Sequence, residues 1–146
     1  MNYTDMIIQI VTAFFGTLGF GFLFNIRGKK LIFAALGGML AWALFLLLAP
    51  VVPSEALRYL IVSACSTTYA EVLARVLKTP ATTFSIITLI PLVPGGALYT
   101  TTTAALARNT EVFIPKLIYT VELAVALSLG IVIVTAIFRR FVHKKV

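Results

Sequence analysis

Reactive and acidic side chains are scarce in this sequence of 146 residues, which contains five acidic residues, one histidine and one cysteine. A single thiol, Cys65, cannot close a disulfide within the chain, and we interpret it as a small packing residue. Without a cluster of cysteine and histidine, the sequence predicts no metal site and no cofactor. Because no nucleophile stands with a base at a recognisable spacing, we also predict that the chain is not an enzyme.

Apolar residues, in contrast, make up 60% of the sequence, and charged residues only 12%. Soluble domains have about 45–50% apolar and about 25% charged residues, and they could not bury so much apolar surface. The composition therefore predicts an integral membrane protein embedded in the lipid bilayer. The net charge of +7 comes from basic residues at the ends of apolar segments. No aromatic residues interleave along a basic face, so we expect no nucleic-acid partner.

Five apolar segments follow one another, each close to the ~20 residues that cross a ~30 Å hydrocarbon layer. They predict a single transmembrane domain over residues 1–146, an all-α bundle of about five helices. The expected helices lie at about residues 5–24, 31–49, 55–77, 82–107 and 114–138. The segments are apolar on all sides instead of alternating with polar residues, which favours helices over the strands of a membrane barrel.

Small residues recur four positions apart in several of these segments. The pairs are Thr17 with Gly21, Ala34 with Gly38, Gly37 with Ala41, and Ala126 with Gly130. Such pairs let membrane helices approach each other closely. We therefore expect them at contacts between helices, and some of these faces at contacts with another polypeptide.

Basic residues are unevenly distributed between the two sides of a five-span arrangement. One side would carry nine of them: Arg27, Lys29, Lys30, Arg75, Lys78, Arg139, Arg140, Lys144 and Lys145. The other side would carry three: Arg58, Arg108 and Lys116. Because Lys and Arg favour the cytoplasmic side, we predict a multi-pass protein of the plasma membrane. Its N-terminus would lie outside and its C-terminus in the cytoplasm.

The fourth segment is interrupted by two prolines and two glycines: Pro91, Pro94, Gly95 and Gly96. Proline has no N–H and crowds the carbonyl one turn earlier, so we expect the carbonyls of Ile87 and Ile90 to lose their helical partners. The pattern predicts a fourth helix broken between Pro91 and Gly96, with a second half that begins near Gly96. The exposed N–H groups of that second half would suit a carboxylate, as in the broken helices of transporters.

A tyrosine and four threonines come directly after this break. We predict a substrate-binding or pathway role for Pro91, Pro94, Gly95, Gly96, Tyr99 and Thr100. The alternative is a packed proline kink that binds nothing. The threonine hydroxyls also have a simpler interpretation, because they can bond back to their own helix.

Three charged residues inside the predicted spans are candidates for gating or coupling. A lone charge at the centre of a bilayer costs about 2.5–3.5 kcal/mol, so each should have a partner or water. Glu71 and Arg75 lie four apart on one helix face, as a gating or a structural ion pair. Glu122 has no basic residue three or four positions away, and it is interpreted as a carrier of a coupling proton or as a solvated residue. Glu55, at the end of a segment, is expected to be solvated.

The residues around the break also resemble a known family. Residues 90–99, Ile-Pro-Leu-Val-Pro-Gly-Gly-Ala-Leu-Tyr, are similar to the signature of the threonine/serine exporter family. The preceding segment 71–84 and the stretch 20–25 near the start also resemble that family. The likeness is greatest to the family's short five-helix subunit.

This resemblance implies that the working transporter combines the short subunit with a longer subunit that carries its own five helices. It also implies export of small amino acids such as threonine and serine, with a two-subunit branch associated with succinate. We therefore predict a membrane subunit of a secondary transporter that exports small amino acids or related small carboxylates. Self-association is a further contact that we consider, apart from this resemblance. A non-transporting scaffold and a passive channel are the alternatives.

Overall fold

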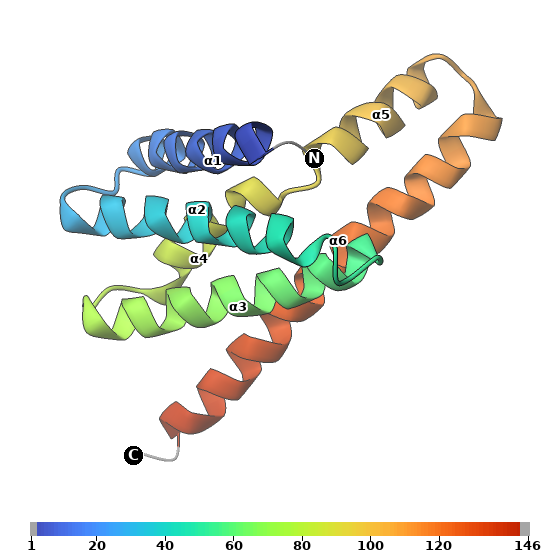
Figure 1. Cartoon of the computed structure of the whole chain (residues 1–146). Helices are drawn as coiled ribbons and strands as arrows, with labels where there is room; N and C mark the ends of the chain where they lie inside the picture. The colour runs from blue at the N-terminus through green and yellow to red at the C-terminus, as the bar shows by residue number, and fades with distance from the viewer. Residues whose placement is uncertain (1–2, 144–146) are drawn as a thin grey trace.

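The computed structural model describes residues 3–143, and it describes the side chains of residues 3–140 (Figure 1). In chain order the helices are α1 (Tyr3–Leu23), α2 (Lys29–Leu48), α3 (Glu55–Val76), α4 (Ala81–Leu89), the short 3-10 helix η1 (Ile90–Leu92), α5 (Gly95–Leu106) and α6 (Thr110–His143). The described residues form no strand, so the predicted all-α class is confirmed. Lys144 and Lys145 of the basic tail lie outside the described residues.

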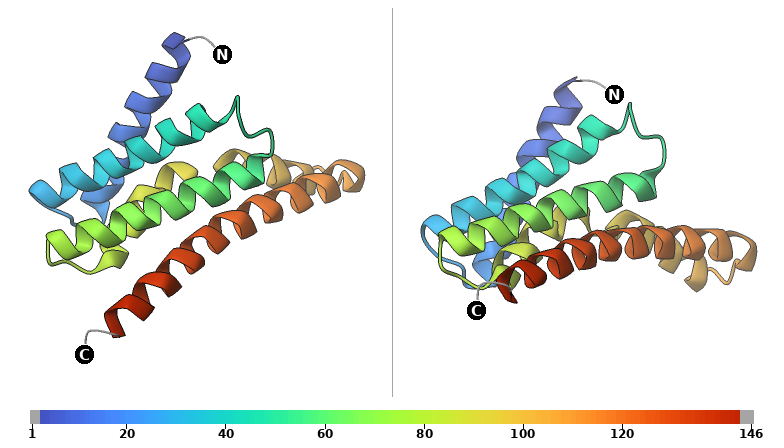
Figure 2. Two further views of the ribbon diagram at one scale, coloured as in Figure 1. Left: turned by 60° about the horizontal axis from the view of Figure 1, so that its bottom comes forward. Right: turned by 90° about the horizontal axis from the view of Figure 1, so that it is seen from below.

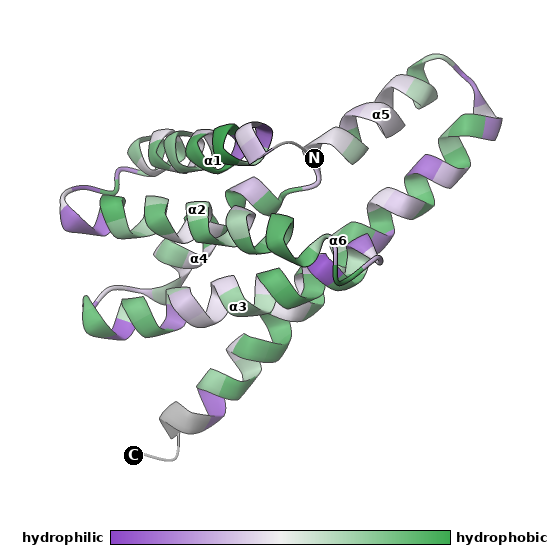
Figure 3. Cartoon of the chain, viewed as in Figure 1, coloured by the Kyte–Doolittle hydropathy of each residue, from purple (hydrophilic) through white to green (hydrophobic). Residues whose placement is uncertain are grey.

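Three helices of the described chain, α1, α2 and α6, are long and apolar enough to cross a membrane. The pair formed by Ala81–Leu92 and Gly95–Leu106 gives a fourth candidate if its two bent halves form one span. Figure 3 shows the apolar residues along α1, α2 and much of α6, while α5 is paler. The expected number of five spans therefore stays a prediction, because α3 is not among these candidates.

Helix α3 carries polar residues on the side that packs against other helices. It packs against α2, α4 and α6. Its Ser63, Ser66 and Thr67 are buried in these contacts, where small polar residues let helices approach closely. Val72 and Val76 are exposed on another side. With 22 residues it is about 33 Å long, which is enough to cross the hydrocarbon layer.

The small-residue pairs lie at helix contacts, as predicted. All eight residues are buried: Thr17, Gly21, Ala34, Gly37, Gly38, Ala41, Ala126 and Gly130. A Cβ added at Gly38 of α2 would lie 2.2 Å from Oγ1 of Thr17 in α1. A Cβ at Gly130 of α6 would lie 2.6 Å from the carbonyl oxygen of Leu60 in α3. These contacts hold the helices closer together than larger side chains would allow.

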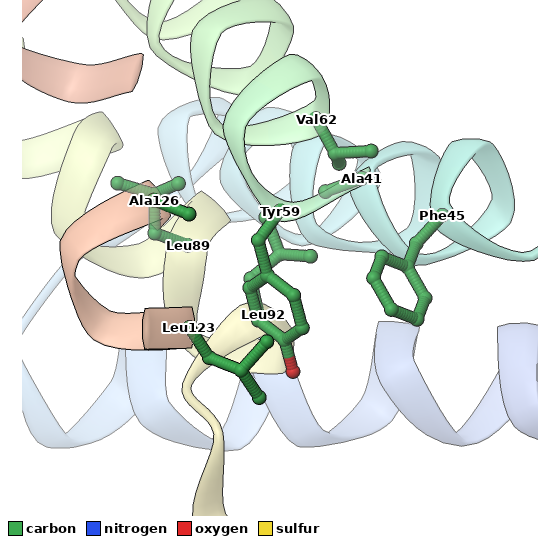
Figure 4. Packing of buried hydrophobic residues seen from close by; sticks show 8 residues of the cluster. All are labelled: Ala41, Phe45, Tyr59, Val62, Leu89, Leu92, Leu123 and Ala126. Atoms are coloured by element: carbon green, nitrogen blue, oxygen red, sulfur yellow. The ribbon is translucent and has the colours of Figure 1, made fainter. Parts of the chain in front are cut away.

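The hydrophobic core next to the helix break is built from α2, α3, α4, η1 and α6 (Figure 4). In this cluster the Tyr59 ring meets the Phe45 ring edge to face, with 5.0 Å between the ring centres. Leu92 of η1 is fully buried, and Leu123 of α6 is almost so. The break is therefore anchored on its α4 side by close packing.

Helix α5 and the first part of α6 extend away from the bundle of α1 to α4, as Figures 1 and 2 show. Helix α6 begins at Thr110, four residues before the expected segment. The side chain of Asn109 accepts a hydrogen bond of 3.3 Å from the N–H of Val112, which caps the helix. Pro115 lies inside α6, where it removes one hydrogen bond without ending the helix.

Candidate functional site

The break in the fourth segment is confirmed. Helices α4 and η1 run from Ala81 to Leu92, and α5 then starts at Gly95 with a bend of 60°. Val93 is extended, and Pro94 immediately precedes the first residue of α5. The second half thus begins one residue before the predicted position.

The prediction that the carbonyls of Ile87 and Ile90 lose their partners is wrong. The carbonyl of Ile87 accepts the N–H of Ile90, and the carbonyl of Ile90 accepts the N–H of Val93 at 3.1 Å. The chain tightens into the 3-10 turn of η1. Backbone hydrogen bonds between residues three positions apart therefore replace the four-apart helical bonds that the prolines remove. The prolines therefore do not free these two carbonyls, but the break does leave backbone N–H donors available.

These donors lie at the start of α5. The N–H of Gly95 bonds to the carbonyl of Val93 at 2.7 Å, and the N–H of Leu98 bonds to that of Pro94 at 3.0 Å. No side chain described in the structure caps this helix. The N–H groups of Gly96 and Ala97 therefore remain without an intrahelical acceptor, at the positive end of the helix dipole.

A hollow of about 200 Å³ opens at this point, which we call the break hollow. It is lined by Trp42, Glu55, Tyr59, Pro91, Val93, Pro94, Gly95, Gly96, Ala97, Tyr119 and Leu123. Four of the predicted pathway residues, Pro91, Pro94, Gly95 and Gly96, thus lie together. A Cβ added at Gly95 or Gly96 would meet no atom within 4 Å, so the two glycines leave open space there.

Among the side chains that the structure describes, Glu55 is the only charged one that lines the break hollow. It is half-buried in the first turn of α3, and the Tyr119 hydroxyl donates a hydrogen bond to its Oε2. Sequence reasoning missed this residue, because an acid at the start of a helix is usually solvated. Glu55 stays partly exposed, as expected, and in addition it contacts Tyr119 of α6, which lies 64 residues further along the chain.

Arg58 stands one turn after Glu55. Its guanidinium carbon lies 4.8 Å from the centre of the Phe45 ring, a cation–π contact. Its Nε is buried and has no hydrogen-bond partner among the described residues. From the sequence, Arg58 contributed only to the predicted orientation in the membrane.

A second hollow of about 310 Å³ lies on the α1 side. Gln9, Thr12, Ala13, Gly16, Thr17, Trp42, Ile90 and Pro91 line it. Trp42 and Pro91 therefore line both hollows. The Trp42 indole donates a hydrogen bond of 3.3 Å to the side-chain oxygen of Gln9 and stacks on Phe45, with 5.3 Å between ring centres. These contacts fix a large side chain that lines both hollows.

Tyr99 and Thr100 are not brought to either hollow. Tyr99 is 70% exposed, and the hydroxyl of Thr100 bonds back to the carbonyl of Ala97 at 3.1 Å. Thr102 and Thr103 also bond back to their own helix. Only Thr101 turns inward, where its hydroxyl lies 2.9 Å from that of Thr120 and joins α5 to α6. The part that Tyr99 and Thr100 take in transport stays a prediction.

Glu71 and Arg75 form the expected ion pair, with 3.4 Å between Nη2 and Oε2. The Arg75 guanidinium also lies over the Phe138 ring of α6, 4.4 Å from its centre. Sixteen residues separate Glu71 from Glu55, which is about 24 Å along α3. The pair is therefore remote from the break hollow. Glu122 is exposed on α6 and lines neither hollow, and its coupling role is untested.

The structure combines apolar helices with one helix that is broken by prolines and glycines, and a small polar hollow lies beside the break. These features define a multi-pass membrane protein of the transporter type. A model of the family described as "Threonine/Serine exporter, ThrE" matches residues 9–137. The chain belongs to the threonine/serine exporter family, and the predicted resemblance is confirmed. The matched region extends from α1 into α6 and includes both hollows. Comparison with curated proteins and with solved structures gives no match.

Proposed function

We propose that this chain is one subunit of a secondary transporter that exports threonine, serine or a related small carboxylate, together with a longer five-helix subunit. Membership in the exporter family supports membrane transport and amino-acid export. The observation that carries this chain's own part is the break hollow, where Pro91, Pro94, Gly95 and Gly96 meet polar groups from α3 and α6.

The size and the lining of the break hollow suit a small polar solute. Its volume of about 200 Å³ lies below the ~300–1,000 Å³ of pockets for drug-sized ligands. The N–H groups of Gly96 and Ala97 would bind the solute's carboxylate. The hydroxyls of Tyr59 and Tyr119 would accept or donate a hydrogen bond to a hydroxyl on the solute.

We further propose that α3 is the fifth span and that the chain lies in the plasma membrane with its N-terminus outside. This arrangement places the positive charges of the predicted cytoplasmic connections on one side. The Glu55 end of α3 would then face outward, and the Glu71–Arg75 pair would stand at the cytoplasmic entrance. Glu122 would carry the coupling proton on α6.

The test is efflux of radiolabelled threonine from proteoliposomes that contain this chain copurified with the longer subunit. Gly96→Leu should lower efflux more than tenfold, because the leucine fills the space in which the solute's carboxylate would lie. The matched control is Gly19→Leu on α1, where an added Cβ also meets no atom within 4 Å and which lines neither hollow. The yield of the copurified complex checks folding in both variants.

Other outcomes would contradict the proposal. Efflux that survives Gly96→Leu unchanged would remove the break hollow from the transport path. Equal efflux through the longer subunit alone would favour a scaffold role for this chain. Steady electrical conductance without saturation by solute would indicate a channel.

A further inference from the structure

We propose that Glu55 determines specificity in the break hollow, where its carboxylate receives the α-ammonium group of the solute. The hollow would then prefer zwitterionic amino acids to small carboxylates that lack an ammonium group. This inference rests on the proposed function and narrows its substrate class.

The Glu55 carboxylate has spare capacity for a ligand. An ionised carboxylate can accept about four hydrogen bonds, and the Tyr119 hydroxyl supplies one of them. Arg58, one turn along α3, lies over the Phe45 ring and does not pair with Glu55. Within residues 3–140, Glu71–Arg75 is the only ion pair. A half-buried carboxylate with one partner is well suited to a cationic group from a solute.

Glu55 and the start of α5 line the same hollow but belong to different helices. One presents a negative charge, and the other presents N–H groups at the positive end of a dipole. An α-amino acid carries an ammonium and a carboxylate on one carbon atom, so it is complementary to both. A dicarboxylate would instead bring a second negative charge into the space beside Glu55, where like charges repel.

A carboxylate in a transporter can also serve as a carrier of the coupling proton, and the two roles differ in exchange experiments. Counterflow of solute across a membrane without an ion gradient needs recognition of the solute but no net proton movement. Loss of ammonium recognition therefore lowers counterflow, whereas loss of coupling alone leaves it intact.

The experiment compares counterflow of L-serine and L-glycerate in proteoliposomes that contain the complex with the longer subunit. The two solutes differ in that a hydroxyl replaces the ammonium. Glu55→Gln keeps the size of the side chain and an acceptor for Tyr119 but removes the charge. Serine counterflow should fall about tenfold to a hundredfold, the range for a hydrogen bond to a charged group. Glycerate counterflow should stay equal or rise.

Two further variants sharpen this comparison. Glu55→Asp keeps the charge and should retain the preference for serine. Glu111→Gln is the matched control, because Glu111 is an exposed acid in the first turn of α6 and lines neither hollow. It should leave the ratio of serine to glycerate counterflow unchanged. Equal losses of serine and glycerate in Glu55→Gln, or serine counterflow that is not reduced, would overturn the inference.

The wild-type complex provides a test that does not depend on a folded variant. L-serine should inhibit threonine counterflow at least tenfold more strongly than L-glycerate, and equal inhibition would overturn the inference. A wild-type complex that exchanges neither serine nor threonine would contradict the proposed function itself. Amino-acid exchange with unaltered selectivity in Glu55→Gln would rule out the specificity role of Glu55 and leave the proposed function standing.

Discussion

The two ends of α3 carry nearly the same pair of residues and use it differently. At one end Glu55 is followed by Arg58, and at the other Glu71 is followed by Arg75. The second acid pairs with its own arginine at 3.4 Å. The first acid does not, and it lines the break hollow instead.

The partners that other helices supply explain this difference. At the Glu71 end, α6 presents the ring of Phe138, which the Arg75 guanidinium covers while it stays beside Glu71. At the Glu55 end, α6 presents the hydroxyl of Tyr119 to the acid. There α2 presents the ring of Phe45, which holds the arginine. Spacing along a helix thus decides which charged residues are neighbours. The facing helices decide whether an acid pairs with its arginine or remains available to a ligand.

The largest expected effect comes from Gly130→Ala, which disturbs both ends of α3 at once. Gly130 lies between Tyr119 and Phe138 on α6, and its added Cβ would lie 2.6 Å from the Leu60 carbonyl oxygen and 3.0 Å from the Ala64 nitrogen. Backbone atoms cannot rotate away, so α3 and α6 must separate. We expect a loss of about 1–3 kcal/mol in the free energy of unfolding, measured by thermal denaturation in detergent.

The matched control for this prediction is Gly19→Ala on α1, where an added Cβ meets nothing within 4 Å. Alanine favours a helix over glycine by about 1 kcal/mol, so this variant should be as stable as the wild type or more stable. Equal shifts in the two variants would show that helix propensity, and not the approach of α3 to α6, decides the stability.

Local signals predicted much of the fold. Long apolar runs mark the helices, and the run of prolines and glycines marks the break within one residue of where α5 begins at Gly95. The spacing of small residues predicted buried faces, which the contact of Gly38 with Thr17 illustrates. Asn109, which directly precedes the first residue of α6, also carries a capping signal that marks the start of this helix.

The site itself was only half predictable. Pro91 to Gly96 carry their own signal, whereas the Glu55 contact depends on Tyr119 and on how α6 crosses α3. The Ala126 and Gly130 pair predicts a close helix contact on α6, but no local pattern specifies α3 as the partner. The expectation of free carbonyls at Ile87 and Ile90 was wrong. Proline removes a hydrogen bond of an α-helix, but a 3-10 turn can supply another in its place.

A smaller effect is expected from Tyr119→Phe. In this variant α6 presents a phenylalanine ring to the Glu55 end of α3, as Phe138 does at the Glu71 end. Removing the hydroxyl takes away the donor that holds Glu55 toward the hollow and leaves the aromatic ring in place. A net hydrogen bond is worth about 0.5–1.5 kcal/mol, so serine counterflow should fall roughly twofold to twelvefold. Counterflow at limiting serine concentration measures this change.

The same substitution at Tyr99 separates the break hollow from the prediction made from sequence. Tyr99 is 70% exposed and lines neither hollow, so Tyr99→Phe should lower serine counterflow less than Tyr119→Phe does. A larger loss at Tyr99 would restore that residue to the solute path and contradict the assignment of Glu55 and Tyr119 to recognition.

The smallest effect is expected at the other end of α3, from a double-mutant cycle with Glu71→Gln and Arg75→Met. Methionine keeps a long apolar side chain next to Phe138 while it removes the charge. Arg75 is 44% exposed, and pairs of this spacing at exposed positions contribute about 0.3–0.5 kcal/mol. The coupling energy from four thermal denaturation curves should fall in that range.

The size of this coupling decides how far the contrast between the two ends extends. A value near 0.3–0.5 kcal/mol would mean that the pair opens readily, as an entrance that must admit solute requires. A coupling of about 3 kcal/mol would instead indicate a pair withdrawn from water, because separating two buried charges leaves each one unsatisfied. The Glu71 end would then be a fixed structural clamp, and only the Glu55 end of α3 would respond to solute.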